Sequence, residues 1–455
     1  MQEKYLEYRK KYPVFYYESY NIDQQEDKVI ISYHFKIDGL SEFSPKWSFK
    51  LPENSNFDTK DEIINNIVFN IGMVEVISYL KATCSPKLVV KCGYLNSDQI
   101  AFYKKLYFNG LGEFFYRNSI ATTIDDFLEI ESTYNKPFLS QELNNLNGNL
   151  ILIGGGKDSL VSLDLLGSDK TNNKCYILNP RDSWVDGVIL SGYTQNDIFS
   201  MKRLIDPNLI ELNKNGYLNG HTPLSALLAV SSLLPAYILN KKNICVSNES
   251  SANEPTVKNT KINHQYSKSF EFETDFRNYC KQFISPSFNY FSVLRPLSEY
   301  QIAKYFSKLV HLHNVFHSCN LGSKTDVWCH ECPKCLFIYL LLSPFLSQQK
   351  LKEIFGVNML EDVKNLPEFE KLIGVTDEKS FECVGSRSEI NFAIKKAIEQ
   401  IPEDDLPILL QTYKEKYMKL DNSNINFDEY FDGNNYVSDE IIKLLKDRVI
   451  ENDNR

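Results

Sequence analysis

The segment from residue 150 to residue 159 reads Leu150-Ile151-Leu152-Ile153-Gly154-Gly155-Gly156-Lys157-Asp158-Ser159. Its four apolar residues predict a buried strand, and the three glycines after them predict a turn of the chain. The next residues carry leucines at 160, 163 and 166, a spacing typical of a helix. Glycine lets backbone N–H groups approach a phosphate closely, and a helix N-terminus favours negative charge. The segment therefore predicts a strand, a turn and a helix that together bind an anion.

The residue after the lysine distinguishes this loop from a Walker A motif. Asp158 stands where a Walker A loop has serine or threonine. The run instead resembles the S-G-G-x-D-S loop of the PP-loop ATP pyrophosphatases, with a glycine at the position of the family's serine. That resemblance implies that the loop binds ATP, which is cleaved between its α and β phosphates. The plainer alternative is a glycine turn in any α/β sheet. The ATP-binding residues implied are Gly154, Gly155, Gly156, Lys157, Asp158 and Ser159.

Composition and charge limit the classes of partner and the compartment. The chain has 455 residues, 43% hydrophobic and 24% charged, as in ordinary globular proteins. Its net charge of −9 argues against broad nucleic-acid binding, which needs a basic surface. The first residues lack the apolar region of a secretory signal, and the apolar runs Leu224–Leu239 and Leu336–Leu346 are too short to span a membrane. We therefore expect a cytoplasmic protein with reduced cysteines and with no membrane or nucleic-acid partner.

Alternating strand and helix patterns predict an α/β fold with a doubly wound parallel sheet. Residues 1–147 are expected to form an α+β domain, residues 148–346 the nucleotide-binding domain, and residues 347–455 a helical C-terminal region. Ligands of such a sheet lie at the carboxyl ends of its strands, so the loops there should surround one pocket. The predicted strands of the second domain are Leu150–Ile153, Cys175–Leu178, Leu209–Leu212 and Ile244–Ser247, and its clearest helix is Thr222–Leu239.

Four cysteines predict a metal site after the sheet. Cys319, Cys329, Cys332 and Cys335 follow the spacing C-x9-C-x2-C-x2-C, and four thiolates can enclose a tetrahedral zinc ion. The run C-x2-C-x2-C alone also suits an iron–sulfur cluster. A similar array in 7-cyano-7-deazaguanine synthase, a PP-loop enzyme, implies structural zinc. The alternative is a chance group of buried cysteines, and His330 is a weaker substitute ligand.

Polar residues near other predicted elements are further candidates for the site. Asn248 and Glu249 follow a strand, and Glu249 and Glu254 could hold Mg²⁺ against a triphosphate. Gly220 and His221 precede the long helix, whose N-terminus would be a second nucleotide contact. The plainer interpretations are a solvated loop for the first segment and a capped turn for the second.

Two residues with side chains that titrate near neutral pH lie farther along the chain. Cys383 stands between an acid and a glycine turn, and a thiol near a cation there would be partly ionised. From that run alone, a packed cysteine is the simpler interpretation. His264 stands in the run 263–269, close to three lysines that could serve a diphosphate or the carboxylates of a substrate. Ordinary surface lysines would give the same pattern.

Taken in order, these segments resemble one enzyme family over most of the chain. The runs are G-G-G-K-D-S, N-G-H, S-N-E-S-S-A-N-E-P, N-H-Q-Y-S-K-S, W-C-x-x-C-P-K-C and F-E-C-V-G. They are similar to the UDP-N-acetylmuramoyl-L-alanyl-L-glutamate epimerases (MurL) of peptidoglycan synthesis, and segments 12–15 and 43–47 extend the similarity to the N-terminal part. The resemblance implies that the small molecule UDP-MurNAc-L-Ala-L-Glu is the substrate. Its terminal L-Glu would become D-Glu while ATP and Mg²⁺ yield AMP and diphosphate.

The chemistry implied by this resemblance is acid–base catalysis on an activated carboxylate. Adenylation removes the carboxylate charge, so the α-proton can be taken and returned on the other face. Asp158 would serve the ATP step, and Cys383 and His264, the recognised residues that titrate nearest neutral pH, are the candidates for exchanging the α-proton. Two alternatives are a PP-loop enzyme that adenylates a nucleobase or another carboxylic acid, as 7-cyano-7-deazaguanine synthase does, and a non-catalytic nucleotide-binding protein.

Overall fold

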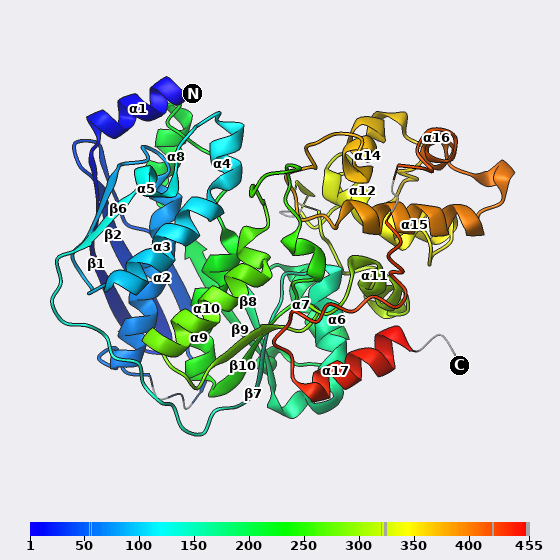
Figure 1. Cartoon of the computed structure of the whole chain (residues 1–455). Helices are drawn as coiled ribbons and strands as arrows, with labels where there is room; N and C mark the ends of the chain where they lie inside the picture. Colours follow the sequence, from blue (N-terminus) through cyan, green and yellow to red (C-terminus); the bar gives the residue numbers. More distant parts are fainter. Residues whose placement is uncertain (54, 56, 320, 323–324, 421–422, 452–455) are drawn as a thin grey trace.

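One mixed sheet runs through the protein and joins its N-terminal half to its central part (Figure 1). The computed structural model describes residues 1–53, 55, 57–319, 321–322, 325–420 and 423–451. The order of strands across the sheet is β11-β10-β7-β8-β9-β4-β2-β1-β5-β6, with β3 paired to β2.

The strands are β1 Val14–Gln25, β2 Lys28–Ile37, β3 Ser41–Phe43, β4 Lys46–Lys50, β5 Lys87–Val90, β6 Glu129–Ser132, β7 Asn147–Leu152, β8 Asn173–Leu178, β9 Ile198–Leu204, β10 Lys241–Val246 and β11 Asn289–Ser292. The α-helices are α1 Gln2–Lys11, α2 Glu62–Leu80, α3 Ser97–Gly110, α4 Gly112–Arg117, α5 Ile124–Phe127, α6 Lys157–Leu165, α7 Asp182–Leu190, α8 Pro207–Lys214, α9 Leu224–Ile238, α10 Phe270–Phe283, α11 Glu299–Ser307, α12 Pro333–Leu342, α13 Gln348–Phe355, α14 Leu366–Ile373, α15 Arg387–Gln400, α16 Ile408–Lys416 and α17 Asp439–Leu445.

The predicted parallel sheet is present as five neighbouring strands, β7 to β11. Successive side chains of β7 enter two different cores. Leu150 and Leu152 pack in the core that contains α9, whereas Ile151 and the following Ile153 pack in the core that contains α6 and α11. Helices therefore cover both faces of this part, and the predicted α/β class is confirmed.

The N-terminal half adds strands of mixed direction to this sheet. β1, β2 and β4 pair antiparallel, β5 and β6 run parallel to β1, and β4 meets the parallel part by antiparallel pairing with β9. Buried and partly exposed side chains alternate in β2, where Ile31, Tyr33 and Phe35 are buried. The chain up to residue 147 therefore shares a sheet with the part that carries the glycine loop.

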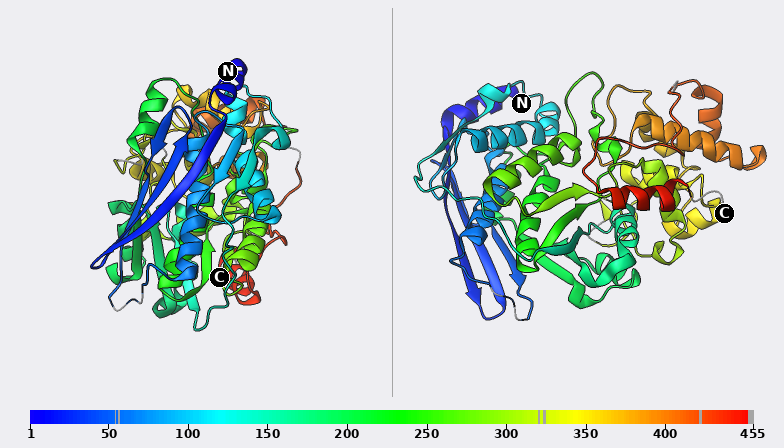
Figure 2. Two further views of the ribbon diagram at one scale, coloured as in Figure 1. Left: turned by 90° about the vertical axis from the view of Figure 1, so that its left-hand side faces the viewer. Right: turned by 60° about the horizontal axis from the view of Figure 1, so that its bottom comes forward.

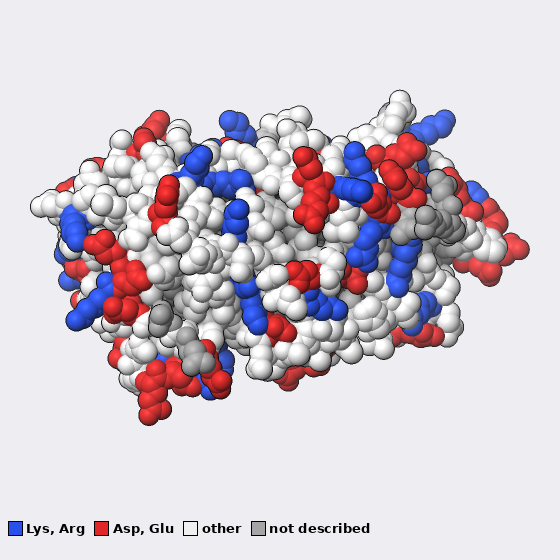
Figure 3. Space-filling view, turned by 90° about the horizontal axis from the view of Figure 1, so that it is seen from below, with Lys and Arg blue, Asp and Glu red and all other residues white. Residues whose placement is uncertain are grey.

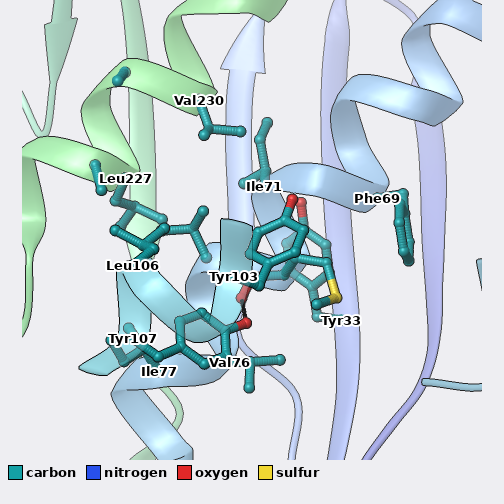
Figure 4. Packing of buried hydrophobic residues seen from close by; sticks show 14 of the residues in the cluster. Tyr33, Phe69, Ile71, Val76, Ile77, Tyr103, Leu106, Tyr107, Leu227 and Val230 are labelled. Atoms are coloured by element: carbon teal, nitrogen blue, oxygen red, sulfur yellow. Dashed lines mark hydrogen bonds between the residues drawn. The ribbon is translucent and has the colours of Figure 1, made fainter. Parts of the chain in front are cut away.

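Helix α2 is the centre of the N-terminal core. Asp61 caps the helix by accepting a hydrogen bond from the backbone N–H of Ile63 (3.0 Å). Nearly all residues of α2 are buried, and Figure 4 shows its side chains meeting those of β2, α3 and α9. Its length and composition would suit a membrane span, but 94% burial inside the protein identifies it as a core helix.

The predicted strand Leu209–Leu212 is wrong, because these residues lie in helix α8. Asp206 caps α8 by accepting a hydrogen bond from the backbone N–H two residues on (2.8 Å), and Pro207 fits its first turn. The strand of this region is β9, in which Phe199 and Met201 alternate as buried residues. Two leucines three residues apart mark the buried side of a helix, and the short apolar run concealed that spacing.

The C-terminal region is helical, as predicted, and lies at the end of the molecule opposite the N-terminal strands (Figure 2). Its last segment returns to the central part. Gln301 of α11 donates a hydrogen bond to the carbonyl of Tyr430 (2.9 Å), and Arg448 pairs with Asp164 of α6 (2.9 Å). Acidic and basic side chains are interspersed on the face drawn in Figure 3.

Candidate active site

The glycine loop connects β7 to α6 and presents backbone rather than side chains. Gly155 has a φ of +69°, which favours glycine, and a Cβ there would collide with the indole of Trp184. A Cβ at Gly156 would lie 2.7 Å from the hydroxyl oxygen of Ser318. The backbone N–H of His317 donates a hydrogen bond to the carbonyl of Gly155 (3.1 Å). The loop is therefore held tightly, with the first turn of α6 immediately behind it.

Gly154, the residue at the position of the serine in the PP-loop motif, behaves differently from its neighbour. A Cβ at Gly154 would meet no atom within 4 Å, and its φ is not in the left-handed region. We expect Gly154→Ser to change the free energy of unfolding by no more than about 0.5 kcal/mol. Gly155→Ser should cost about 1–3 kcal/mol from backbone strain alone. Chemical denaturation of the two variants tests this, and equal losses of stability would contradict it.

Three carboxylates meet at the start of α6. Asp158 lies in the first turn of this helix, Glu249 follows β10, and Glu299 is the first residue of α11. One ligand oxygen from each lies within 4.8 Å of the others. The buried ammonium of Lys157 forms ion pairs with Asp158 and Glu299. Asp158 and Glu249 were predicted from the sequence, whereas Glu299 was missed because its run resembles an ordinary capped helix start.

Burial and charge act on these carboxylates in opposite directions. Burial raises the pKa of Glu299 to about 8, although Lys157 opposes the change. Burial also disfavours the charged form of Asp158, but Lys157 and Lys334 together lower its pKa. A further positive charge beside Glu299 would therefore favour its ionised form. A divalent cation would supply it, so the three oxygens fit a hard cation such as Mg²⁺.

Glu254 does not join this group. Its carboxylate forms ion pairs with Lys379 (2.7 Å) and Arg387 (3.1 Å). These cations stand on either side of the loop that carries Cys383. The expectation that Glu249 and Glu254 share a cation is therefore not met, and Glu254 instead anchors the C-terminal loop to the central part.

The thiol of Cys383 lies among three cationic groups. Lys268 and His264 both contact it, and the ammonium of Lys334 donates a hydrogen bond to its backbone carbonyl. Burial alone would raise the pKa of the Cys383 thiol, but Lys268, His264 and Lys334 lower it to about 5. These three cations therefore favour the thiolate form of the buried Cys383 side chain.

His264 and His221 meet at one carboxylate. The Nδ1 atom of His264 lies 2.5 Å from Oε2 of Glu113, and Nδ1 of His221 lies 3.5 Å from the same oxygen. Burial would lower the pKa of His264, but hydrogen bonds with Cys383 and Glu113 raise it to about 9. Burial and the charge on His264 lower the pKa of His221 to about 4. The cluster therefore holds one imidazolium, on His264.

The remaining predicted nucleotide contacts lie in two places. Helix α9 begins at Leu224, three residues after His221, and the carbonyl of Gly220 accepts a hydrogen bond from Lys81 (2.7 Å). His221 contacts Glu113 and His264, so its partners are these residues of the cluster. Asn248 adjoins Glu249, and its carbonyl accepts a hydrogen bond from the Ser292 hydroxyl (2.5 Å).

The electrostatic effect of Lys268 connects the two parts of the site. Its ammonium is buried, and the charges of Cys383, Glu249 and Asp158 raise its pKa despite that burial. The lysine therefore lies close enough to both the thiolate and the carboxylates to stabilise each. The carboxylates beside the glycine loop and the thiol of Cys383 therefore belong to one site.

The four predicted thiol ligands come together, with their sulfurs within 4.8 Å of one another. They are Cys319, Cys329, Cys332 and Cys335. Three pairs of sulfurs are 3.3, 3.8 and 3.9 Å apart. Four sulfurs at about 2.3 Å from a tetrahedral zinc lie about 3.8 Å apart, so the group fits this metal. The backbone N–H of Gly322 donates to the Cys319 sulfur (3.0 Å), whereas His330 donates to the carbonyl of Phe355 (2.5 Å).

Comparison with known proteins assigns the family. Residues 7–293 match the model of the MurL N-terminal domain and residues 315–425 that of the MurL C-terminal domain. The chain is 31% identical to a UDP-N-acetyl-alpha-D-muramoyl-L-alanyl-L-glutamate epimerase of Salinispora tropica over 87% of each chain. It is 33% identical to one of Xanthomonas oryzae pv. oryzae over 71% of this chain and 72% of the relative. These matches establish that the chain belongs to the MurL family of epimerases.

Proposed function

We propose that this enzyme converts the terminal L-Glu of UDP-MurNAc-L-Ala-L-Glu to D-Glu, using ATP and releasing AMP and diphosphate. The names of its relatives support the substrate. One structural observation supports the chemistry: three carboxylates converge beside the glycine loop, and Lys268 lies between them and Cys383, which also contacts His264. An anion site thus adjoins a pair of groups able to accept and donate a proton.

The glycine loop and the N-terminus of α6 would bind the phosphates of ATP. Mg²⁺ fits between Asp158, Glu249 and Glu299, where it would neutralise charge on the triphosphate. Lys157 is held in place by Asp158 and Glu299 and can turn toward a phosphate oxygen when that site fills. The cationic groups would thereby favour attack of the substrate carboxylate on the α-phosphate, which forms an acyl adenylate.

Activation of the carboxylate makes the α-proton transferable. Removing it from a free carboxylate would place two negative charges side by side. In the acyl adenylate one of these charges is absent, and the carbonyl withdraws electrons from the α-carbon. The Cys383 thiolate can accept the proton, and the His264 imidazolium can donate one. Hydrolysis of the acyl phosphate would then release the product.

The decisive experiment incubates the enzyme with ATP, Mg²⁺ and UDP-MurNAc-L-Ala-L-Glu and analyses the glutamate chirally after hydrolysis. We expect D-Glu to form together with AMP and diphosphate, and neither to appear when ATP is omitted. A deazapurine carboxylic acid serves as the control substrate. Diphosphate release with that acid and none with the muropeptide precursor would contradict the proposal, and so would ATP binding without turnover.

The four cysteines support a structural zinc site that fixes Lys334 opposite the Cys383 loop. We expect about one zinc ion per chain in freshly purified enzyme. Removing it with a chelator should lower the melting temperature by several degrees, because the energy of metal binding contributes to folding. Elemental analysis and thermal melting measure both. Iron in place of zinc, or four freely titratable thiols without any metal, would contradict this assignment.

A further inference from the structure

A glutamate of the N-terminal half enters the site and belongs to none of the recognised motifs. Glu113 lies on α4 and is 151 residues away from His264 in the sequence. Its side chain is only 6% exposed. Its two oxygens have different partners, because Oε2 faces His264 and His221 whereas Oε1 accepts a hydrogen bond from Arg117 (3.0 Å). The carboxylate is therefore directed at the histidine pair.

The short contact between Glu113 and His264 is a hydrogen bond rather than half of a metal site. Two ligands of a tetrahedral zinc ion, each about 2.1 Å from the metal, lie more than 3 Å apart. Oε2 of Glu113 and Nδ1 of His264 are 2.5 Å apart. That distance is typical of a charge-assisted hydrogen bond between a carboxylate and an imidazolium. With Nδ1 bound to Glu113, Nε2 of His264 remains for the thiol of Cys383.

The charges around Glu113 explain why only one histidine is protonated. Burial alone would raise the pKa of Glu113, but His264, His221 and Arg117 lower it, so the carboxylate stays ionised. The single negative charge of Glu113 stabilises one imidazolium, and the proton resides on His264, which is closer to the carboxylate. His221 stays neutral and packs on His264 with 4.3 Å between ring centroids. Lys81 further disfavours a second charge on His221.

We propose that Glu113 is a positioning residue that holds His264 as an imidazolium facing Cys383, and thereby keeps this thiol ionised. The three side chains form a Glu113–His264–Cys383 relay built from the N-terminal, central and C-terminal parts of the chain. Its catalytic use rests on the proposed function. The ionisation of Cys383 does not, because it is a property of the enzyme without substrates.

The other charged groups around the relay are kept unchanged in the test. Lys268 and Lys334 face Cys383, with Glu382 beside it in the chain. Beyond Lys268 lie Asp158 and Glu249. Since both lysines remain in a Glu113 variant, any change in thiol ionisation reports the loss of the imidazolium.

The test measures alkylation of Cys383 by iodoacetamide as a function of pH in the zinc-loaded enzyme. Mass spectrometry of the peptide that contains Cys383 follows this thiol among the ten cysteines of the chain. In the parent enzyme we expect a midpoint well below that of an ordinary thiol. In Glu113→Gln the midpoint should rise by about one pH unit or more, because an adjacent positive charge is lost. Glu113→Asp should rescue part of this shift.

Glu62→Gln is the matched control, since Glu62 is also an acid at a helix start of the N-terminal half but is exposed and pairs with Lys136 (3.1 Å). Its midpoint should equal that of the parent. An unchanged midpoint in a folded Glu113→Gln variant overturns the proposal. If that variant fails to fold, the parent enzyme still tests the proposal. An alkylation midpoint of Cys383 near pH 8.5, as for an ordinary thiol, would overturn it as well. A second zinc ion per chain that Glu113→Gln removes would also overturn it.

Deuterium exchange separates this proposal from the proposed function. If the midpoint shifts in Glu113→Gln and this variant also exchanges the α-proton of the substrate more slowly, the relay and the proposed function both stand. If the midpoint shifts while the parent enzyme forms no D-Glu, the relay stands and the proposed function fails.

Discussion

Replacing Cys383 with serine is expected to abolish inversion at the α-carbon while ATP-dependent diphosphate release continues. A serine hydroxyl does not ionise at neutral pH, whereas the pKa of the Cys383 thiol is lowered to about 5. Loss of a general base reduces a rate by about 10²- to 10⁴-fold. The adenylation step depends on the glycine loop and the carboxylates instead. The two activities should therefore separate in this variant.

The measurement is a reaction in D₂O that follows deuterium at the α-carbon, the configuration of glutamate and diphosphate together. His264→Asn should likewise lose inversion while diphosphate release continues. Cys92→Ser is the matched control, because Cys92 is also half-buried but lies in the N-terminal core. If both site variants incorporate deuterium at the parent rate, neither residue is the base.

The pH dependence of inversion follows from the ionisation of Cys383 and His264. Below about pH 5 the thiolate gains a proton and can no longer accept one. Above about pH 9 the imidazolium of His264 loses the proton that it would donate. The rate should therefore fall on both sides of this range.

The second large effect is expected from Asp158→Ala, which should remove diphosphate release altogether. Asp158 stands at the N-terminus of α6 and holds Lys157, and its carboxylate is one of the three that fit Mg²⁺. Losing such a charged contact with a reacting phosphate costs about a hundredfold or more in rate. Glu299→Gln should also slow diphosphate release and raise the Mg²⁺ concentration that gives half of the maximal rate.

Asp164→Asn is the control for this variant, because Asp164 lies on the same helix and pairs with Arg448 instead. It should keep the parent rate of diphosphate release. Thermal melting separates lost chemistry from lost folding. Near-parent release in a folded Asp158→Ala enzyme would falsify the assignment of the glycine loop as the ATP site.

Local patterns predicted the parts of the site that lie within one stretch of chain. The glycine loop is recognisable because a strand, a turn and a helix follow one another, and the cysteines because their spacing is short. Glu299 and Glu113 had no such signal. Each is one acid in a helix start, and only the fold brings it to Asp158 or to His264. The ionisation of Cys383 likewise depends on Lys268, a residue 115 positions earlier in the chain.

The fold was predicted to a similar degree. The apolar runs of β7, β8 and β10 and the long helix α9 were predicted from the sequence pattern. The strand assigned to Leu209–Leu212 failed because a helix of eight residues offers only two turns of pattern. Pairing of β4 with β9 was also invisible, since hydrogen bonding between distant strands leaves no local trace in a sequence.

That pairing has a consequence for the order in which the chain folds. β4 ends at Lys50, and its partner β9 begins at Ile198, so one edge of the N-terminal strands stays open until much of the chain has been synthesised. Closing such a long loop costs conformational entropy before the contact forms, which slows folding. An open strand edge is also a template for unwanted pairing. The edge of β4 in the newly made N-terminal half is therefore exposed to such pairing until β9 has been synthesised.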